Sequence, residues 1–123
     1  MLLVLAGCGK ARTPCVPVAG QVFLDGKPLP MGFIRVIPEK GRAATATLDA
    51  EGRFHLSTFN TGDGCIRGTH AVEVIAKQSL GKNNTHWVVP EKYGKAATSG
   101  LKVTIDKATD SLRIDLVSDV EKR

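Results

Sequence analysis

Three histidines are the residues of this 123-residue chain that are best suited to acid–base chemistry or metal binding. His55, His70 and His86 are widely spaced, and no HxH or HxxE pattern joins them to each other or to an acid. Catalysis needs several such groups to converge at one place. The sequence also contains no Gly-x-Ser-x-Gly elbow and no phosphate-binding loop. We therefore expect no enzymatic activity, no cofactor and no metal centre.

Three acidic residues in turns offer a weaker alternative. Asp49, Glu51 and Asp63 could gather a calcium ion between loops, because carboxylate oxygens are ligands that calcium prefers. Acidic residues are common in turns for local reasons, since their side chains accept hydrogen bonds from nearby backbone. We expect these three residues to serve the turns.

Cys8 has the sequence surroundings of a lipid-modified cysteine. Leu5-Ala6-Gly7-Cys8 resembles the bacterial lipobox, whose cysteine thiol accepts a diacylglyceryl group. The apolar run before Cys8 is very short and carries no Lys or Arg, unlike a complete secretory signal. Two alternatives stay open: the true start lies upstream of Met1, or the segment is not a signal. We expect residues 1–7 to be a truncated lipoprotein signal segment.

The stretch from Cys8 onward is predicted to be a flexible tether over residues 8–17. It contains Lys10, Arg12, Pro14 and Pro17 and has no hydrophobic periodicity. Nothing in the sequence approaches the ~20 apolar residues of a transmembrane helix. Attachment to a membrane would therefore depend on the lipid, and we expect an extracytoplasmic, membrane-anchored lipoprotein of the cell envelope.

Cys15 and Cys65 form a candidate disulfide. If Cys8 is acylated, an even number of cysteines remains, as is typical outside the cytoplasm. A bridge between them would close a loop of about fifty residues and add ~3–4 kcal/mol in the chain-entropy treatment. The alternative is two free thiols, and the sequence does not decide between them. The cysteine spacings match no zinc pattern.

Seven short apolar runs separated by turn residues predict an all-β fold. Thirteen Gly and six Pro in so short a chain favour many turns. Several of the runs alternate apolar and polar residues with period two, which is typical of strands with one buried face. The pattern predicts a seven-stranded antiparallel, immunoglobulin-like β-sandwich over residues 18–117, followed by a charged tail over residues 118–123. The predicted strands are residues 18–24, 33–37, 44–48, 53–58, 69–77, 101–105 and 111–117.

Two long loops, residues 59–68 and 78–100, are the expected places for partner contacts. Trp87 and Tyr93 in the second loop are candidate partner-binding residues, because exposed aromatic side chains contribute much of the energy of interfaces. The alternative is that both side chains close one end of the core, together with the apolar patch at residues 88–93.

The charge pattern argues against nucleic acid as a partner. The formal net charge is +5, but the basic residues are scattered and form no long run. One Trp, one Tyr and four Phe are too few for an obvious base-stacking platform. A scattered basic surface suits proximity to an anionic membrane.

The sequence resembles a known family of β-sandwich domains. Gly20-x-Val22-x-Leu24-Asp25-Gly26-Lys27-Pro28-Leu29-Pro30, followed by Thr47-x-Asp49-x-x-Gly52-Arg53-Phe54, is similar to the carboxypeptidase regulatory-like, or transthyretin-like, family. Gly62-Asp63-Gly64, Pro90-Glu91-Lys92-Tyr93 and Thr98-Ser99-Gly100-Leu101 are similar to segments of small bacterial lipoproteins of that family. The resemblance covers residues 18–117. It implies a transthyretin-like sandwich that binds, spaces or braces, without an assigned activity.

These observations predict a non-enzymatic, lipid-anchored module of the cell envelope that binds or supports a partner. One alternative is a carbohydrate- or peptide-binding domain with a defined ligand, so that the partner would be an envelope protein or a glycan. Another is a ureide hydrolase of the transthyretin-like type. That enzyme ends in a Tyr-Arg-Gly-Ser signature, whereas this chain ends Val120-Glu121-Lys122-Arg123, so the transfer is not supported.

Overall fold

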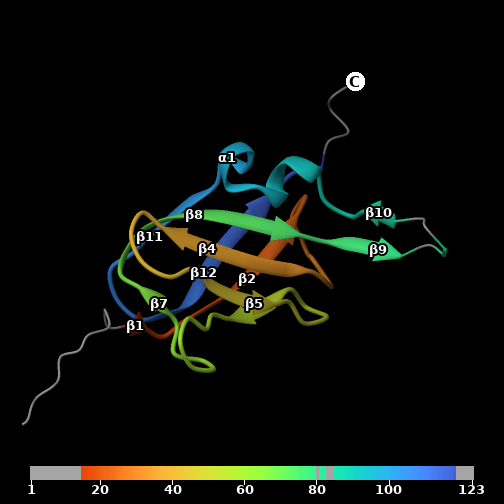
Figure 1. Cartoon of the computed structure of the whole chain (residues 1–123). Coiled ribbons are helices and arrows are strands. Elements are labelled where there is room, and N and C mark those ends of the chain that lie inside the picture. The colour runs from red at the N-terminus through yellow and green to blue at the C-terminus, as the bar shows by residue number, and fades with distance from the viewer. Residues whose placement is uncertain (1–14, 80, 83–84, 119–123) are drawn as a thin grey trace, which may run out of the picture.

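The computed structural model describes residues 15–79, 81–82 and 85–118, and these residues are mostly β-strand (Figure 1). The prediction of an all-β fold is confirmed at this level. One four-stranded antiparallel sheet contains, in spatial order, β11 (Lys102–Ile105), β8 (Gly68–Ile75), β4 (Phe33–Pro38) and β5 (Ala44–Thr47). The other contains β12 (Thr109–Leu116) and β2 (Val18–Leu24), with β3 (Lys27–Pro28) and β6 (Arg53–His55) both paired to β2.

Two short ribbons and two helical turns complete the described chain. One ribbon pairs β1 (Cys15–Val16) with β7 (Cys65–Ile66), and the other pairs β9 (Lys77–Ser79) with β10 (Thr85–Trp87). The second ribbon projects from the body of the molecule, beside the 3₁₀ turn η2 (Glu91–Gly94) (Figure 1). The single helical turn α1 (Ala96–Ser99) follows η2 on the side away from this ribbon. β1 therefore lies within the stretch that was predicted to be a tether. The predicted signal segment and the predicted tail beyond Ser118 lie outside the described residues.

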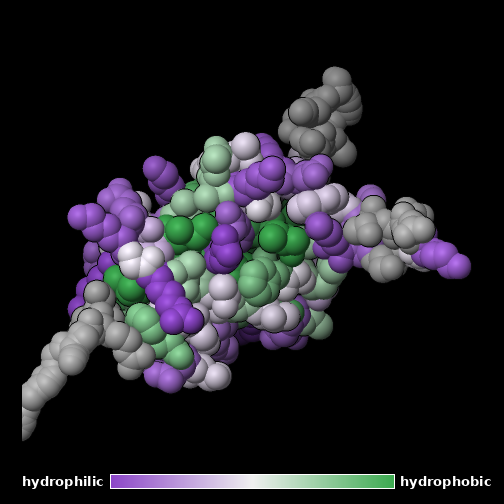
Figure 2. Space-filling model, viewed as in Figure 1, coloured by the Kyte–Doolittle hydropathy of each residue, from purple (hydrophilic) through white to green (hydrophobic). Residues whose placement is uncertain are grey.

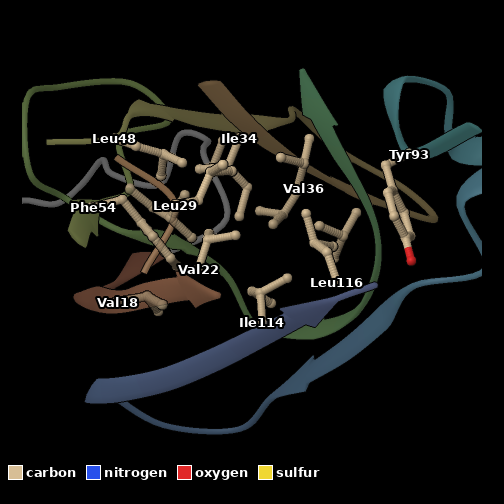
Figure 3. Close-up of a cluster of buried hydrophobic side chains, with 14 of the residues drawn as sticks. Val18, Val22, Leu29, Ile34, Val36, Leu48, Phe54, Tyr93, Ile114 and Leu116 are labelled. Carbon is tan, nitrogen blue, oxygen red and sulfur yellow. The ribbon is translucent and has the colours of Figure 1, made fainter. Parts of the chain in front are cut away.

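Alternating residues explain why the two larger sheets face each other. Ile34 and Val36 of β4 and Val72 and Val74 of β8 are fully buried, whereas the residues between them point outward. Val22 from the second sheet is buried in the same cluster. Figure 3 shows the labelled side chains converging between the two sheets, with Tyr93 at one end of the cluster (Figure 3). One apolar core is thus shared by both sheets.

The prediction of a wholly antiparallel arrangement is wrong at one pair of strands. β12 runs parallel to β2, with Ile114 opposite Val22 and Leu116 opposite Leu24. The chain leaves β11 at the edge of the first sheet and crosses to the free edge of the second, where it arrives in the same direction as β2. Alternation of apolar residues fixes the buried face of a strand but carries no information about its direction.

Two of the predicted strands end two or more residues before their expected last residue, because the chain forms a different strand pairing there. The predicted strand 53–58 ends at His55, because Ser57 exchanges two backbone hydrogen bonds with Thr45 of β5, each 3.0 Å long. The chain therefore passes from one sheet to the other at this point. The predicted strand 69–77 ends at Ile75, and Lys77 begins the separate β9–β10 ribbon.

The outer face of the first sheet is neither uniformly polar nor uniformly apolar. Arg35 and Glu73 form an ion pair across β4 and β8, with 3.1 Å between Nε and Oε1. Phe33 on the same face is 38% exposed. Figure 2 shows hydrophobic side chains on both sides of a small hydrophilic strip over these strands (Figure 2).

Candidate functional site

Trp87 ends β10 and is held in a fixed position by two neighbours. It lies opposite Lys77 in the β9–β10 ribbon, and the Lys77 ammonium sits 4.9 Å from the centre of the indole ring. The outer edge of the ring packs against Gly94, where an added Cβ would come within 2.9 Å of Cη2 of the indole. The ring is nevertheless only half-buried. Trp87 is therefore a pre-positioned aromatic surface, of the kind that loses little freedom on binding.

An open groove of about 580 Å³ runs along this tryptophan. Three of the residues that line it are apolar and lie deeper than the polar ones, since Val89 and Pro90 are buried and Val88 is half-buried. His86 and Glu91 are exposed on its rim and supply hydrogen-bonding groups. An apolar floor with a few polar groups around it is the usual composition of a ligand site. The residues that line the groove are His86, Trp87, Val88, Val89, Pro90, Glu91 and Ser118.

Tyr93, the other aromatic candidate, lies inside the protein and does not line this groove. Its side chain is 4% exposed and belongs to the core cluster. The Tyr93 hydroxyl accepts a hydrogen bond from the backbone N–H of Val117 at 3.1 Å and donates to the carbonyl of the same residue at 3.4 Å. Tyr93 therefore closes the end of the core and anchors the chain after β12, which is the alternative that the sequence left open.

The three cysteines have different positions relative to the described residues. Cys8 lies outside them. Cys15 is half-buried and Cys65 is fully buried, and both are free thiols. Cys15 pairs with Ile66 and Cys65 pairs with Val16, so the cysteines are staggered by one residue on adjacent strands. Because successive side chains point to opposite faces of a strand, this register directs the two thiols to opposite faces of the ribbon.

We expect the two thiols of the reduced protein to differ strongly in reactivity. Burial raises the pKa of Cys65 to about 11, and electrostatic repulsion from the nearby Cys15 adds to this effect. The thiolate is the reactive form, so only about one Cys65 in a thousand is ionised at pH 8. Iodoacetamide at pH 8 should modify Cys15 well before Cys65, with sites assigned by peptide mass spectrometry. The Cys65 rate should rise as the pH approaches 11, and both thiols should react alike in denaturant. Equal rates in the native protein would contradict this expectation.

The structure does not bring the three histidines together. His55 is exposed on β6 and His86 is exposed on β10. His70, on β8, is fully buried. Its Nε2 donates to the carbonyl of Ile66 at 2.6 Å, whereas its Nδ1 has no partner within the described part of the chain. The phase of His70 with Val72 and Val74 explains its burial.

The acidic turn residues are engaged by their own loops. The Asp49 carboxylate accepts hydrogen bonds from the backbone of Arg53 and Glu51, at 2.9 and 2.8 Å, and these bonds lower its pKa. Asp63 accepts bonds from the backbone of residues 58–60, at 2.7, 3.1 and 3.0 Å. Partial burial favours a higher pKa for Asp63, but these hydrogen bonds outweigh it and hold the pKa below its usual range. Across residues 15–79, 81–82 and 85–118, no three His, Cys, Asp or Glu side chains are grouped as metal ligands.

A second hollow, of about 300 Å³, lies on the outer face of the second sheet. The Arg113 guanidinium stacks 3.9 Å from the centre of the Phe23 ring at this site. β12 is irregular between Thr109 and Leu112, and a Cβ at Gly20 would overlap the Leu112 carbonyl. A glycine inside a strand indicates such a close approach, so Gly20 was the one sequence signal for this site.

Comparisons with protein-family models, with curated proteins and with solved structures find no match for this chain. No helix within the described residues is long and apolar enough to cross a membrane.

Proposed function

We propose that this chain is a non-enzymatic, lipid-anchored β-domain of the bacterial cell envelope, and that it binds its partner in the groove beside Trp87. The observation that carries the proposal is the combination of a fixed, half-exposed indole with an apolar floor and a polar rim. The domain itself is a sandwich of the transthyretin-like type. The two facing four-stranded sheets support this assignment.

A glycan is the partner that this groove favours. A sugar ring can lay its C–H face on the indole while its hydroxyl groups bond to the His86 imidazole and the Glu91 carboxylate on the rim. These two residues and Trp87 come from adjacent parts of the chain and border one space. Aromatic side chains offer a large rigid surface together with directional polar neighbours, which suits a ligand that is itself both polar and apolar.

The hydrogen bonds and positions of the acidic and histidine side chains support a protein without catalytic activity. Asp49 and Asp63 accept hydrogen bonds from their own loops, and His70 bonds to a neighbouring carbonyl inside the core. His55 and His86 stand on separate elements. Within the described residues, these groups do not form the nucleophile–base constellation that a reaction would need.

The proposed location in the cell envelope depends on lipid modification of Cys8, and the intact mass of the protein tests it. Protein expressed from its native locus, including the DNA upstream of Met1, should be recovered in the membrane fraction with a diacylglyceryl group on Cys8 as its first residue. The same spectrum reports a Cys15–Cys65 disulfide as the loss of two hydrogens. An unmodified chain that starts at Met1 would remove the lipoprotein part of the proposal and leave the groove to be tested separately.

A further inference from the structure

β12 is an outer strand with one unpaired edge. It pairs with β2 on one side, and no other strand of the described chain pairs with it. Figure 3 shows the labelled Ile114 and Leu116 pointing from β12 into the core (Figure 3). An unpaired strand edge offers a row of backbone N–H and C=O groups to another strand. β12 is therefore a place where the sheet can continue into a second molecule.

Two outward side chains of β12 carry opposite charges, and each is one residue away from Ile114 in the sequence. Arg113 and Asp115 are 56% and 58% exposed. The Arg113 Nε donates to both oxygens of the Asp115 carboxylate, at 3.0 Å each. The residues on either side of them, Leu112 and Leu116, belong with Ile114 on the inner face. Residues 112–116 thus form a sequence that is symmetric in character, with leucine at both ends and opposite charges around a central isoleucine.

We propose that two copies of this chain associate through β12, antiparallel and with the two-fold axis at Ile114. In this register Arg113 of each copy faces Asp115 of the other, and Leu112 faces Leu116. Opposite charges that face each other across paired strands stabilise the pair. Shifting the strands by two residues in either direction would place Arg113 opposite Arg113 or Asp115 opposite Asp115, which repel. The charges therefore select one register.

The backbone of β12 is oriented for this pairing. The Leu116 carbonyl accepts a hydrogen bond from Asp25 at the end of β2, at 2.9 Å. The N–H and C=O groups of Val117 instead meet the Tyr93 hydroxyl, on the side away from β2. Because backbone groups alternate sides along a strand, those of Arg113 and Asp115 also face the free edge. Each Arg113–Asp115 pair can therefore exchange both of its N–H···O bonds across the two-fold axis.

The same features limit the length of the interface. Tyr93 occupies the edge at Val117, and the irregularity between Thr109 and Leu112 interrupts the other end. Only residues 112–116 are free to pair in regular geometry. An interface this small forms a weak dimer, with a Kd on the order of 10–500 µM.

Sedimentation velocity of the full-length chain, in reductant and across about 5–500 µM, tests the proposal. The wild-type protein should change from monomer to dimer with concentration. Arg113→Asp and Asp115→Arg should each stay monomeric, because each places like charges opposite one another. An equimolar mixture of these two variants should form a heterodimer, since one copy then presents acidic side chains at both positions and the other presents basic ones. The double variant Arg113→Asp/Asp115→Arg should again dimerise with itself.

Lys102→Asp is the matched control, because Lys102 is exposed on β11, the outer strand of the other sheet. It should dimerise as the wild type does. Thermal unfolding of every variant verifies that the monomer is folded. A wild-type chain that remains monomeric at the highest concentration would overturn the proposal. So would dimerisation that survives both single charge reversals, or a mixture of the two variants that does not associate.

Discussion

Replacing Tyr93 by alanine should cost the fold about 3–5 kcal/mol, the range for removing a large buried aromatic side chain. The ring fills one end of the core, and its hydroxyl satisfies both backbone groups of Val117. Truncation removes this packing and leaves those groups without their partner. A domain of this size should then melt about 15–25 °C lower, as measured by differential scanning calorimetry.

Two further variants separate the two contributions of Tyr93. Tyr93→Phe keeps the ring and removes the hydroxyl, so it should cost only about 1 kcal/mol. Lys102→Ala changes an exposed residue on β11 and should leave the melting temperature nearly unchanged. A melting temperature for Tyr93→Ala close to that of the wild type would show that Tyr93 does not close the core. Its role as an exposed binding residue would then have to be reconsidered.

Replacing Trp87 by alanine should abolish glycan binding while preserving the folded domain. Trp87 is half-buried at the base of a projecting ribbon, so its removal costs the core far less than the removal of Tyr93. The loss of affinity should exceed tenfold, because the indole provides the surface on which the ligand stacks. Co-sedimentation of the full-length chain with purified peptidoglycan sacculi measures this loss.

Two matched variants make that experiment interpretable. Glu91→Gln keeps the shape of the groove rim but removes its charge, and it should weaken retention on sacculi. Lys102→Ala changes an exposed residue that does not line the groove and should be retained like the wild type. Retention of Trp87→Ala at the wild-type level would place glycan binding elsewhere on the chain.

The strands were the most predictable part of this protein. Val72 and Val74 alternate with polar or small residues, and this period of two fixes both the strand and its buried face. The parallel pairing of β12 with β2 was not predictable in the same way, because strand direction depends on how the chain crosses between sheets. The burial of His70 is predictable from the same period, since His70 shares the phase of the buried valines.

The candidate site was predictable in part. The aromatic residues of the second loop were identifiable from the sequence, but the difference in burial between their side chains depends on tertiary packing. Tyr93 turns into the core, whereas Trp87 is held outside it by Lys77 and Gly94. The β9–β10 ribbon looked like a loop because each of its strands has only three residues and several are polar. Residues of this ribbon line the groove, so the sequence alone does not locate the groove.

The stagger between Cys15 and Cys65 likewise depends on a register that the sequence does not encode clearly. β1 and β7 have two residues each, too few to show a period. Their pairing places the cysteines on neighbouring strands, as a bridge would need, but one residue out of line. The bridge therefore stays a prediction, and the mass of the native protein decides it.

The fluorescence of Trp87 tests the proposed groove most directly, because this is the only tryptophan in the chain and its emission reports on one place. The full-length chain should be titrated with soluble oligomers of N-acetylglucosamine. The proposal predicts a saturable change in emission that is weakened by Glu91→Gln and unaffected by Lys102→Ala. Emission that stays constant up to millimolar oligosaccharide would contradict the assignment of this groove as a glycan-binding site.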